Sequence, residues 1–459
     1  MTVLTATSFA RALLGASLLC VALDAQTFDG VDDASKPVMA AARSRIEAIR
    51  KGDFQIKVTD ATGKPFAGRA AVRLIRHQFR FGASAYGIPR LPETARTRTL
   101  GVIDELFNTV TVTNYWPENE PVRGGERNWA DADWMVKWAG EHGKTMRFHS
   151  MFFPSVKWLR EVRTTEEWWR IVEERIRAIA ERYGARIHEY DVLNEVASHA
   201  WIWAKELDAD RDVAAFPHFS EIANATRCFQ IARKSQPEAE LVNNDQTIAA
   251  PGSAPLATHL KYNRDLLAAG APIDVIGHQA HFYASGQTPF QEGHASFGKG
   301  AFTMAVLDKG LDLLGSTGKP VHLTEFSPPS RDNKRQGPQP RLSDEEVAAW
   351  QVNYYTLAFS KPFVHELTRW FVVDELGGRG IDAGLIAKDG KLKPAYYALR
   401  QLLNETWSTR WEGQVQDGVA AFRGFYGEYR IEAPDSQATF WAREGSNGAI
   451  SVKLTRRNR

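Results

Sequence analysis

IHEYDVLNEV, residues 187–196, is a short and largely apolar run that ends at an amide and a carboxylate, Asn194 and Glu195. Short apolar runs between helices are typically parallel strands covered on both faces, and polar groups at their carboxyl ends face the active site of a barrel. A second run, KPVHLTEF at residues 319–326, places Glu325 in the same way. It follows about three βα units later, at roughly 40 residues each. We therefore expect Glu195 and Glu325 to share one active site.

The surrounding chain alternates strand-like runs with amphipathic helical segments. Strands are predicted at residues 79–84, 107–113, 144–151, 187–196, 239–244, 273–280, 321–325 and 366–373. Helices are predicted at 92–106, 131–142, 164–183, 219–234, 256–269, 343–360 and 394–403, and two of them begin with capping boxes, Thr164-x-x-Glu167 and Ser343-x-x-Glu346. Eight alternations favour an α/β fold, a (β/α)8 TIM barrel over residues 77–407, rather than a doubly wound sheet.

Both flanks of this region have β-type patterns. Residues 51–74 alternate apolar and polar side chains around a turn at Asp60–Pro65, and short alternating runs return after Trp411. The C-terminal region of roughly 50 residues is too short to form a sandwich alone. We expect segments 50–76 and 411–459 to pack together as one small flanking β module built from the chain ends.

Composition limits the partners. The chain has 459 residues, 43% of them hydrophobic, which is enough for a barrel and a smaller module, and its net charge of +2 favours neither nucleic acid nor an acidic membrane surface. The only cysteines, Cys20 and Cys228, argue against a disulfide framework and a cysteine-ligated metal. Residues 1–25 contain Arg11 and a short apolar run typical of a signal peptide, so we expect a secreted or periplasmic protein without a membrane span.

Two carboxylates facing each other across a barrel mouth suit glycoside hydrolysis, in which one carboxylic acid protonates the leaving oxygen while the other carboxylate attacks or stabilises the anomeric carbon. The alternative is that Glu195 and Glu325 form salt bridges or cap helices, although neither has a basic neighbour in sequence. His278 and His281 could suggest a metal pair, but residues three apart on a strand point to opposite faces. We expect no metal and no cofactor.

Several ordered motifs carry a family resemblance. They are Phe107-Asn-x-Val-Thr111, Phe148-His149-Ser150 with Pro154-Ser155, Asp191-Val-x-Asn194-Glu195, Gly277-x-Gln279-x-His281, Thr324-Glu325, Trp370, and Lys393-Pro-Ala-Tyr-Tyr-Ala-Leu399. With these motifs the chain resembles glycoside hydrolase family 10, the endo-1,4-β-xylanase-like family of retaining barrels, over about residues 77–407.

The resemblance implies Glu195 as general acid/base and Glu325 as nucleophile, with carboxyl groups roughly 5 to 5.5 Å apart as in retaining enzymes. It also implies that Asn194 binds the sugar 2-hydroxyl and that His281 orients Glu325. The full set of implied substrate-binding residues is Asn194, His149, Gln279, His281, Trp370, Asn114 and Trp116. The stretch Asn243-Asn244-Asp245 either supports the acid/base glutamate indirectly or forms a turn.

The sequence departs from the family pattern around the glycone, the part of the substrate on the non-reducing side of the cleaved bond. The family's clamping lysine is missing from residues 112–118, Met151 replaces a glutamine, and residues 375–378 replace a second tryptophan. Because discrimination depends on paired hydroxyls, we expect a divergent glycone subsite.

We expect a monomeric retaining hydrolase that cleaves β-1,4 linkages in xylan or a related plant polysaccharide or oligosaccharide. The alternatives are a related β-glycosidase of different sugar specificity, a carbohydrate-binding barrel without turnover, and a metal-dependent barrel hydrolase.

Overall fold

The computed structural model describes residues 31–153, 156–197, 218–245, 249–282, 303–329, 343–374, 376, 381–446 and 448–457. The expected signal peptide at 1–25 and the motif residues Pro154 and Ser155 lie outside these ranges. So does most of the stretch at 375–378.

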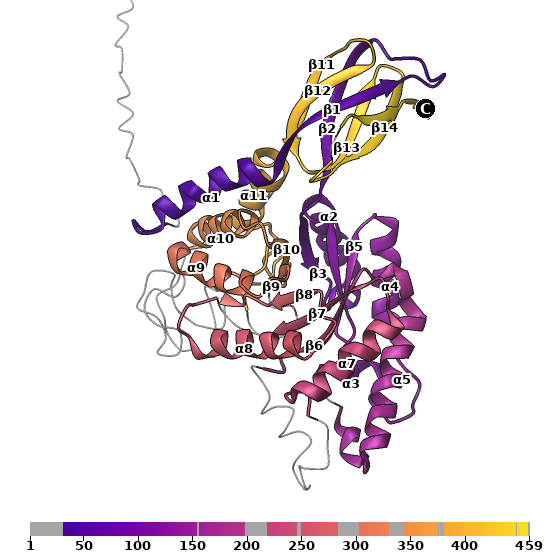
Figure 1. Cartoon of the computed structure of the whole chain (residues 1–459), viewed down its shortest axis with the longest axis vertical. Helices are drawn as coiled ribbons and strands as arrows, with labels where there is room; N and C mark the ends of the chain where they lie inside the picture. Colours follow the sequence, from indigo (N-terminus) through magenta and orange to yellow (C-terminus); the bar gives the residue numbers. More distant parts are fainter. Residues whose placement is uncertain are drawn as a thin grey trace, which may run out of the picture.

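Eight parallel strands close into a barrel in the order β10-β3-β4-β5-β6-β7-β8-β9. Their bounds are β3 (Arg80–Ser84), β4 (Thr109–Thr113), β5 (Thr145–His149), β6 (Glu189–Asn194), β7 (Glu240–Asp245), β8 (Val275–His278), β9 (Val321–Phe326) and β10 (Val364–Arg369). Helices cover the outside of the barrel (Figure 1), so most strand residues are buried on both faces. The predicted (β/α)8 fold is confirmed.

The helices of the barrel begin largely where the sequence signals place them. They are α2 (Glu93–Leu106), α3 (Trp116–Asn119), α4 (Ala130–Glu141), α5 (Thr165–Tyr183), α7 (Ile222–Ser235), α8 (Ala254–Ala268), α9 (Met304–Gly315), α10 (Asp344–Phe359) and α11 (Pro394–Gln401). Ser343 and Glu346 form the predicted reciprocal capping box of α10. At α5, Thr164 accepts from the Glu167 backbone N–H, but the Glu167 carboxylate accepts from the Arg163 N–H instead. In the described part of the chain, no helix has both the length and the apolar character needed to cross a membrane.

Three of the described α-helices were not expected from the sequence, namely the short α3, α9 and the N-terminal α1 (Lys36–Ile49). Helix α1 buries only Met39, Ala42 and Ile46, so its apolar stripe is narrow and its sequence signal weak. Its position depends on tertiary contacts with the barrel helices.

The two chain ends form a small β module at one end of the molecule, where the indigo and yellow strands of Figure 1 lie together. One sheet has the order β12-β1-β15 and the other β11-β2-β13-β14-β16. The strands are β1 (Lys51–Thr59), β2 (Gly68–His77), β11 (Arg410–Val415), β12 (Val419–Phe425), β13 (Gly427–Ala433), β14 (Ser436–Ala442), β15 (Ile450–Lys453) and β16 (Thr455–Arg456). A separate apolar core that includes Ile56 and Tyr429 lies in the module. The predicted flanking module is confirmed.

The module contacts loops that precede barrel strands. Arg76 Nη1 donates to Gly143 O at 2.6 Å, just before β5, and the Glu444 N–H donates to Gln78 Oε1 at 3.2 Å, just before β3. Because the barrel strands are parallel, these loops lie at the end opposite to Glu195 and Glu325. The module therefore lies away from the mouth that carries the candidate catalytic residues.

Arg50 joins α1 and the module to the barrel. Its guanidinium donates to the backbone oxygens of Phe359, Lys361 and Val364 at 2.6 to 2.8 Å. We expect Arg50→Met to lower the free energy of unfolding by about 2 to 4 kcal/mol, because three carbonyls lose a charged donor. Urea titration would measure the change, with Arg43→Met on the exposed face of α1 as the control. Equal midpoints for the two variants would contradict this role of Arg50.

Candidate active site

The two glutamates reach the same mouth of the barrel from well-separated strands. Glu195 directly follows β6, and Glu325 is the fifth residue of β9. Strands β7 and β8 lie between β6 and β9 in the barrel, and all of these strands run in parallel. The strand ends therefore place both carboxylates on one face, as the sequence indicated.

Buried amides connect the two carboxylates. Gln279 Nε2 donates to Glu195 Oε1 at 2.9 Å and to Asn194 Oδ1 at 3.2 Å. Asn244 Nδ2 donates to Asn194 Oδ1 and to Glu325 Oε1, both at 2.8 Å. Asn194 Oδ1 thus lies at the centre of a chain of hydrogen bonds that runs from one glutamate to the other. Thr324 Oγ1 donates to Asn244 Oδ1 at 2.6 Å and fixes the orientation of that amide.

Two histidines lie beside Glu325. His281 Nε2 is 3.1 Å from Glu325 Oε2, and its Nδ1 is 3.2 Å from Ser327 Oγ. His149 Nδ1 donates to Asp191 Oδ2 at 2.6 Å and lies 3.8 Å from Glu325 Oε1. Each ring is therefore held by a second contact, which is the arrangement expected of groups that orient a reactive carboxylate.

The pKa values of the two glutamates are shifted in opposite directions. Burial raises the pKa of Glu195 above its ordinary value, and the negative charge of Glu325 adds to this increase, against a hydrogen bond from Gln279. Burial also disfavours ionisation of Glu325, but His149 and the hydrogen bond from His281 outweigh it and lower the pKa of Glu325 to about 2. One carboxyl group is thus biased towards the protonated acid and the other towards the carboxylate. Paired groups with separated pKa values are typical of acid/base and nucleophile assignments.

The backbone around the site adopts an uncommon conformation at two positions. Glu195 and Ala280 have φ angles of 57° and 59°, in the left-handed region that non-glycine residues rarely occupy. The Glu195 N–H donates to Asn244 O at 2.9 Å, and the Ala197 N–H donates to Asp245 Oδ2 at 2.8 Å. These bonds hold the turn that points the Glu195 side chain into the mouth, and strained backbone of this kind concentrates at functional sites.

Aromatic rings border the cluster on the β3, β4 and β10 side. The Trp370 ring lies edge-on to His149 at 5.2 Å and to His281 at 6.2 Å between centroids. Tyr115 lies edge-on to His149 at 5.6 Å. Trp370 therefore lies beside the two histidines that flank Glu325, and its contact with substrate stays a prediction.

The other two expected binding residues differ in their positions. Asn114 lies directly after β4, and its backbone N–H donates to His149 O. Trp116, in contrast, is fully buried, packs edge-on to Phe152 and Trp158, and has the Arg175 guanidinium over its ring at 4.8 Å. The expectation that Trp116 contacts substrate is therefore wrong, because helix α3 begins at this residue and turns its side chain into the core.

Tyr115, Asp191 and Asn244 belong to the cluster but were not named as site residues from the sequence. Asn244 was read as an indirect support of the acid/base glutamate or as part of a turn, whereas it bonds Glu325 directly. Tyr115 adjoins Asn114 in sequence, so its place at a strand end was the available signal. Asp191 was expected only as part of a family motif. Its contact with His149 joins the neighbouring strands β5 and β6.

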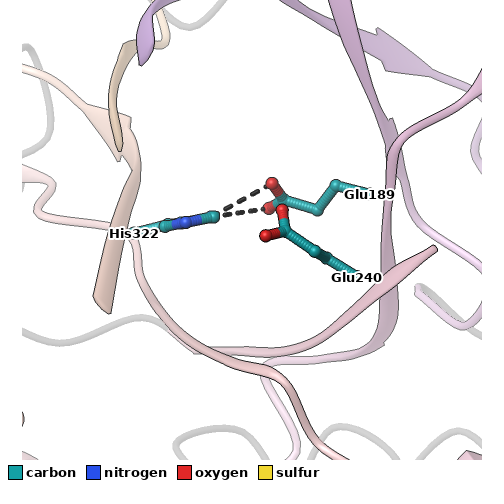
Figure 2. Close-up of side chains that lie close together, drawn as sticks. All are labelled: Glu189, Glu240 and His322. Atoms are coloured by element: carbon teal, nitrogen blue, oxygen red, sulfur yellow. Dashed lines mark hydrogen bonds and ion pairs between the residues drawn. The ribbon is translucent and has the colours of Figure 1, made fainter. Parts of the chain in front are cut away.

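A second cluster of ionisable groups occupies the opposite end of the barrel. Figure 2 shows Glu189 and Glu240 pointing towards His322, with ligand-type atoms within 4.8 Å of one another. Arg80 supplies a positive charge there, because its Nη2 lies 2.7 Å from Glu240 Oε2 and 2.8 Å from His322 Nε2. Burial and the nearby Arg80 charge lower the pKa of His322 to about 3, so the neutral ring donates from Nδ1 to Glu189 and accepts from Arg80. We read this cluster as an ion network that closes the barrel floor, since Arg80 takes the place of a cation.

Comparisons with known proteins agree with this architecture. The model of a family described as "Glycosyl hydrolase family 10" matches residues 73–402. The chain is 28% identical over 400 residues to "Anti-sigma-I factor RsgI6" of Acetivibrio thermocellus, covering 85% of this chain and 46% of that protein. It is 25% identical over 414 residues to "Endo-1,4-beta-xylanase 2" of Arabidopsis thaliana, covering 88% and 34%. The chain thus spans less than half the length of these relatives.

Solved structures share the barrel. Xylanase 10B from Thermotoga petrophila RKU-1, determined in complex with xylobiose, has a TM-score of 0.55 at 20% identity, covering 72% of this chain and 95% of its own. A GH10 structure from Paenibacillus barcinonensis has a TM-score of 0.56 at 22% identity, with 71% and 95% covered. At these identities the similarity establishes a common fold.

Proposed function

This chain belongs to glycosyl hydrolase family 10, and from this membership we propose that it hydrolyses β-1,4 glycosidic linkages in xylan or a related plant polysaccharide. The proposed reaction is a double displacement with retention of configuration at the anomeric carbon. The observation that carries the proposal is the pair of glutamates at one barrel mouth whose pKa values shift in opposite directions.

In the first step, Glu325 attacks the anomeric carbon as a carboxylate while Glu195 gives its proton to the leaving glycosidic oxygen. The low pKa of Glu325 keeps the nucleophile ionised, and the raised pKa of Glu195 favours the protonated acid. In the second step, Glu195 takes a proton from water, which attacks the anomeric carbon and releases Glu325. The same carboxyl group thus acts as acid and then as base.

The surrounding residues position these two groups and the sugar. His281 and Asn244 contact the Glu325 carboxylate at 3.1 and 2.8 Å, and Gln279 contacts Glu195 at 2.9 Å. Asn194 Nδ2 is buried without a hydrogen-bond partner among the described groups. We propose that this unused donor bonds the sugar 2-hydroxyl, since a buried amide N–H without an acceptor is costly.

The test is hydrolysis of xylan and of aryl β-xylobioside, with the first-formed sugar observed by proton NMR. Release of the β-anomer before mutarotation is expected from a retaining enzyme. Release of the α-anomer would contradict the mechanism, and folded protein that turns over no β-glycan would contradict the function.

Asn244→Asp tests the electrostatic role of the amide network. The new carboxylate would lie beside Glu325, and a neighbouring negative charge disfavours ionisation, so the pKa of Glu325 should rise. We expect the acidic limb of kcat/KM against pH to move to higher pH by about one unit or more, with reduced activity at pH 4. Asn404→Asp, at the other end of the barrel, is the control. Identical acidic limbs in the two variants would contradict the role of Asn244.

A second candidate function is carbohydrate binding without turnover. The departures from the family pattern on the glycone side favour this function. The stretch that contains Pro117 lacks the family's lysine, and Met151, which replaces the family's glutamine, is fully buried. Binding of xylo-oligosaccharide by calorimetry together with no hydrolysis after prolonged incubation would support this function over the first.

We also propose that the protein is exported and acts as a monomer. The support for export is the signal-like sequence at residues 1–25. Amino-terminal sequencing of the mature protein would test it, and retention of residues 1–25 would contradict it. Sedimentation velocity would test the oligomeric state.

A further inference from the structure

A buried arginine lies inside the barrel, close to the candidate active site. Arg147 is on β5, two residues before His149, and its side chain is fully buried. The interiors of such barrels are filled mainly by bulky branched apolar side chains, and a buried charge is costly unless it is paired and hydrogen-bonded. The partners of Arg147 therefore show what the guanidinium does there.

The guanidinium of Arg147 crosses the barrel. Its Nη2 donates to Thr324 O on β9 at 2.7 Å, and its Nε donates to Thr111 Oγ1 on β4 at 3.2 Å. In the closed order of eight strands, β9 is the fourth strand from β5 in either direction, so these two strands lie on opposite sides of the barrel. Arg147 thus connects the strand that carries Glu325 to the opposite wall.

The strand that carries Glu325 is irregular at this contact. The register between β9 and β10 shifts between Leu367 and Arg369. At the shift, two residues of β9, Thr324 and Glu325, oppose a single residue of β10, which is the pattern of a β-bulge. Bulges beside active sites direct a side chain away from its regular position. Arg147 donates to a carbonyl oxygen of this bulge, directly before Glu325.

A second contact of Arg147 leads to the histidine beside Glu325. Arg147 Nη1 lies 3.8 Å from Asp191 Oδ1, and neither atom has a hydrogen-bond partner among the described groups. Asp191 is fully buried, and its Oδ2 accepts from His149 Nδ1, which lies 3.8 Å from Glu325 Oε1. The positive charge of Arg147 thus faces the carboxylate that holds His149 in place.

The charge of Arg147 also acts on the candidate nucleophile. Burial disfavours ionisation of Glu325, but His149 and His281 outweigh it and lower its pKa to about 2, and Arg147 adds to this effect. Burial likewise disfavours the charged guanidinium, but Asp191 and three glutamates, Glu325 among them, outweigh it and raise the pKa of Arg147. Loss of the guanidinium would therefore favour protonation of the surrounding carboxylates.

We propose that Arg147 is a positioning residue for the hydrolysis, which fixes the bulge that carries Glu325 and supplies the positive charge beside Asp191. It acts through the Thr324 carbonyl and through Asp191, because its own side chain is fully buried and out of reach of a substrate. This inference rests on the proposed function.

Arg147→Met tests this role by separating kcat from KM. We expect kcat on aryl β-xylobioside to fall about 100-fold, the scale on which a small misplacement of a reacting group slows an enzyme, while KM changes little. The acidic limb of kcat/KM against pH should move up by about one unit or more, because Glu325 loses a nearby positive charge. Natural kcat and a natural acidic limb in the folded variant would overturn the proposal.

Two further variants separate positioning from folding. Arg147→Lys keeps the charge, but one ammonium cannot replace a guanidinium fork that reaches three strands. It should keep the natural acidic limb and still lose about tenfold in kcat, so an undiminished kcat would overturn the proposal even if Arg147→Met does not fold. Arg80→Met, at the barrel floor, is the control for loss of a buried guanidinium, and it should lower resistance to urea without moving the acidic limb. An equal movement of the limb in both methionine variants would also overturn the proposal.

Failure of the proposed function gives a different result. If the natural protein turns over no glycoside, the carboxyl ¹³C resonance of Glu325, assigned by its absence in Glu325→Ala, is followed against pH. Its midpoint should lie near pH 2 in the natural protein and move upwards in Arg147→Met. An unchanged midpoint in the folded variant would overturn the role of Arg147 independently of turnover.

Discussion

Glu325→Ala is expected to reduce kcat on aryl β-xylobioside on the order of 10⁵-fold, the scale seen when a covalent nucleophile is removed. The reason is that Glu325 is the ionised carboxylate of the pair and lies among His281, Asn244 and His149, which hold and stabilise its charge. Without it, no glycosyl-enzyme can form. Steady-state kinetics would measure the loss, and exposed Glu238→Ala is the matched control.

Added azide gives this variant a diagnostic outcome. The shortened side chain leaves room on the face from which Glu325 attacks, so azide should attack the anomeric carbon directly and restore part of the activity. A single displacement inverts configuration, and the product should therefore be the α-glycosyl azide. Retention of substantial activity by Glu325→Ala without azide, or a β-azide product, would assign the nucleophile elsewhere.

Glu195→Gln is expected to lose about 10²- to 10⁴-fold in kcat/KM on xylan, because general acid catalysis of leaving-group departure contributes on this scale. Substrates with acidic phenol leaving groups need little proton donation, so their first step should be nearly unaffected. The comparison of xylan with aryl glycosides of decreasing phenol pKa would measure this contrast. Equal losses on all substrates would argue that Glu195 does not act as the acid.

The pH profile gives a second readout of Glu195→Gln. In the natural protein, kcat/KM should fall as pH rises through the raised pKa of Glu195, and the acidic limb should lie near the Glu325 pKa of about 2. The glutamine variant should lose the basic limb. It should also be more resistant to thermal unfolding at neutral pH, because burial disfavours the charged form of Glu195 in the folded state. A basic limb that persists in the variant would contradict the assignment.

The sequence predicted the strands well and their ends less well. The run at 273–280 was read as one strand, whereas β8 covers only Val275–His278. The reason lies at Ala280, whose positive φ turns the chain and directs Gln279 and His281 to different glutamates. Apolar patterning cannot reveal such a turn, because Ala280 is as apolar as a strand residue.

The same limit explains why Trp116 was named as a binding residue and Tyr115 was not. Both follow β4, and the family resemblance implied the tryptophan as a substrate-binding residue. The short helix α3 begins at Trp116 and turns it onto Phe152 and Trp158, while Tyr115 keeps a place beside His149. Local sequence does not encode which of two adjacent rings faces the mouth.

The amino-acid sequence by itself determined the barrel and placed Glu195 and Glu325 at one mouth, because alternating parallel strands and helices oblige all carboxyl ends to face the same way. Only the tertiary structure decided the burial, the hydrogen bonds and the nearby charges of these carboxyl groups. Asn244 lies near the carboxyl end of β7 and Gln279 directly follows β8, whereas His149 is the last residue of β5. Their distances to the glutamates depend on barrel closure. Burial and short-range charge act through those distances, so the opposite pKa shifts of the pair are a property of the folded barrel.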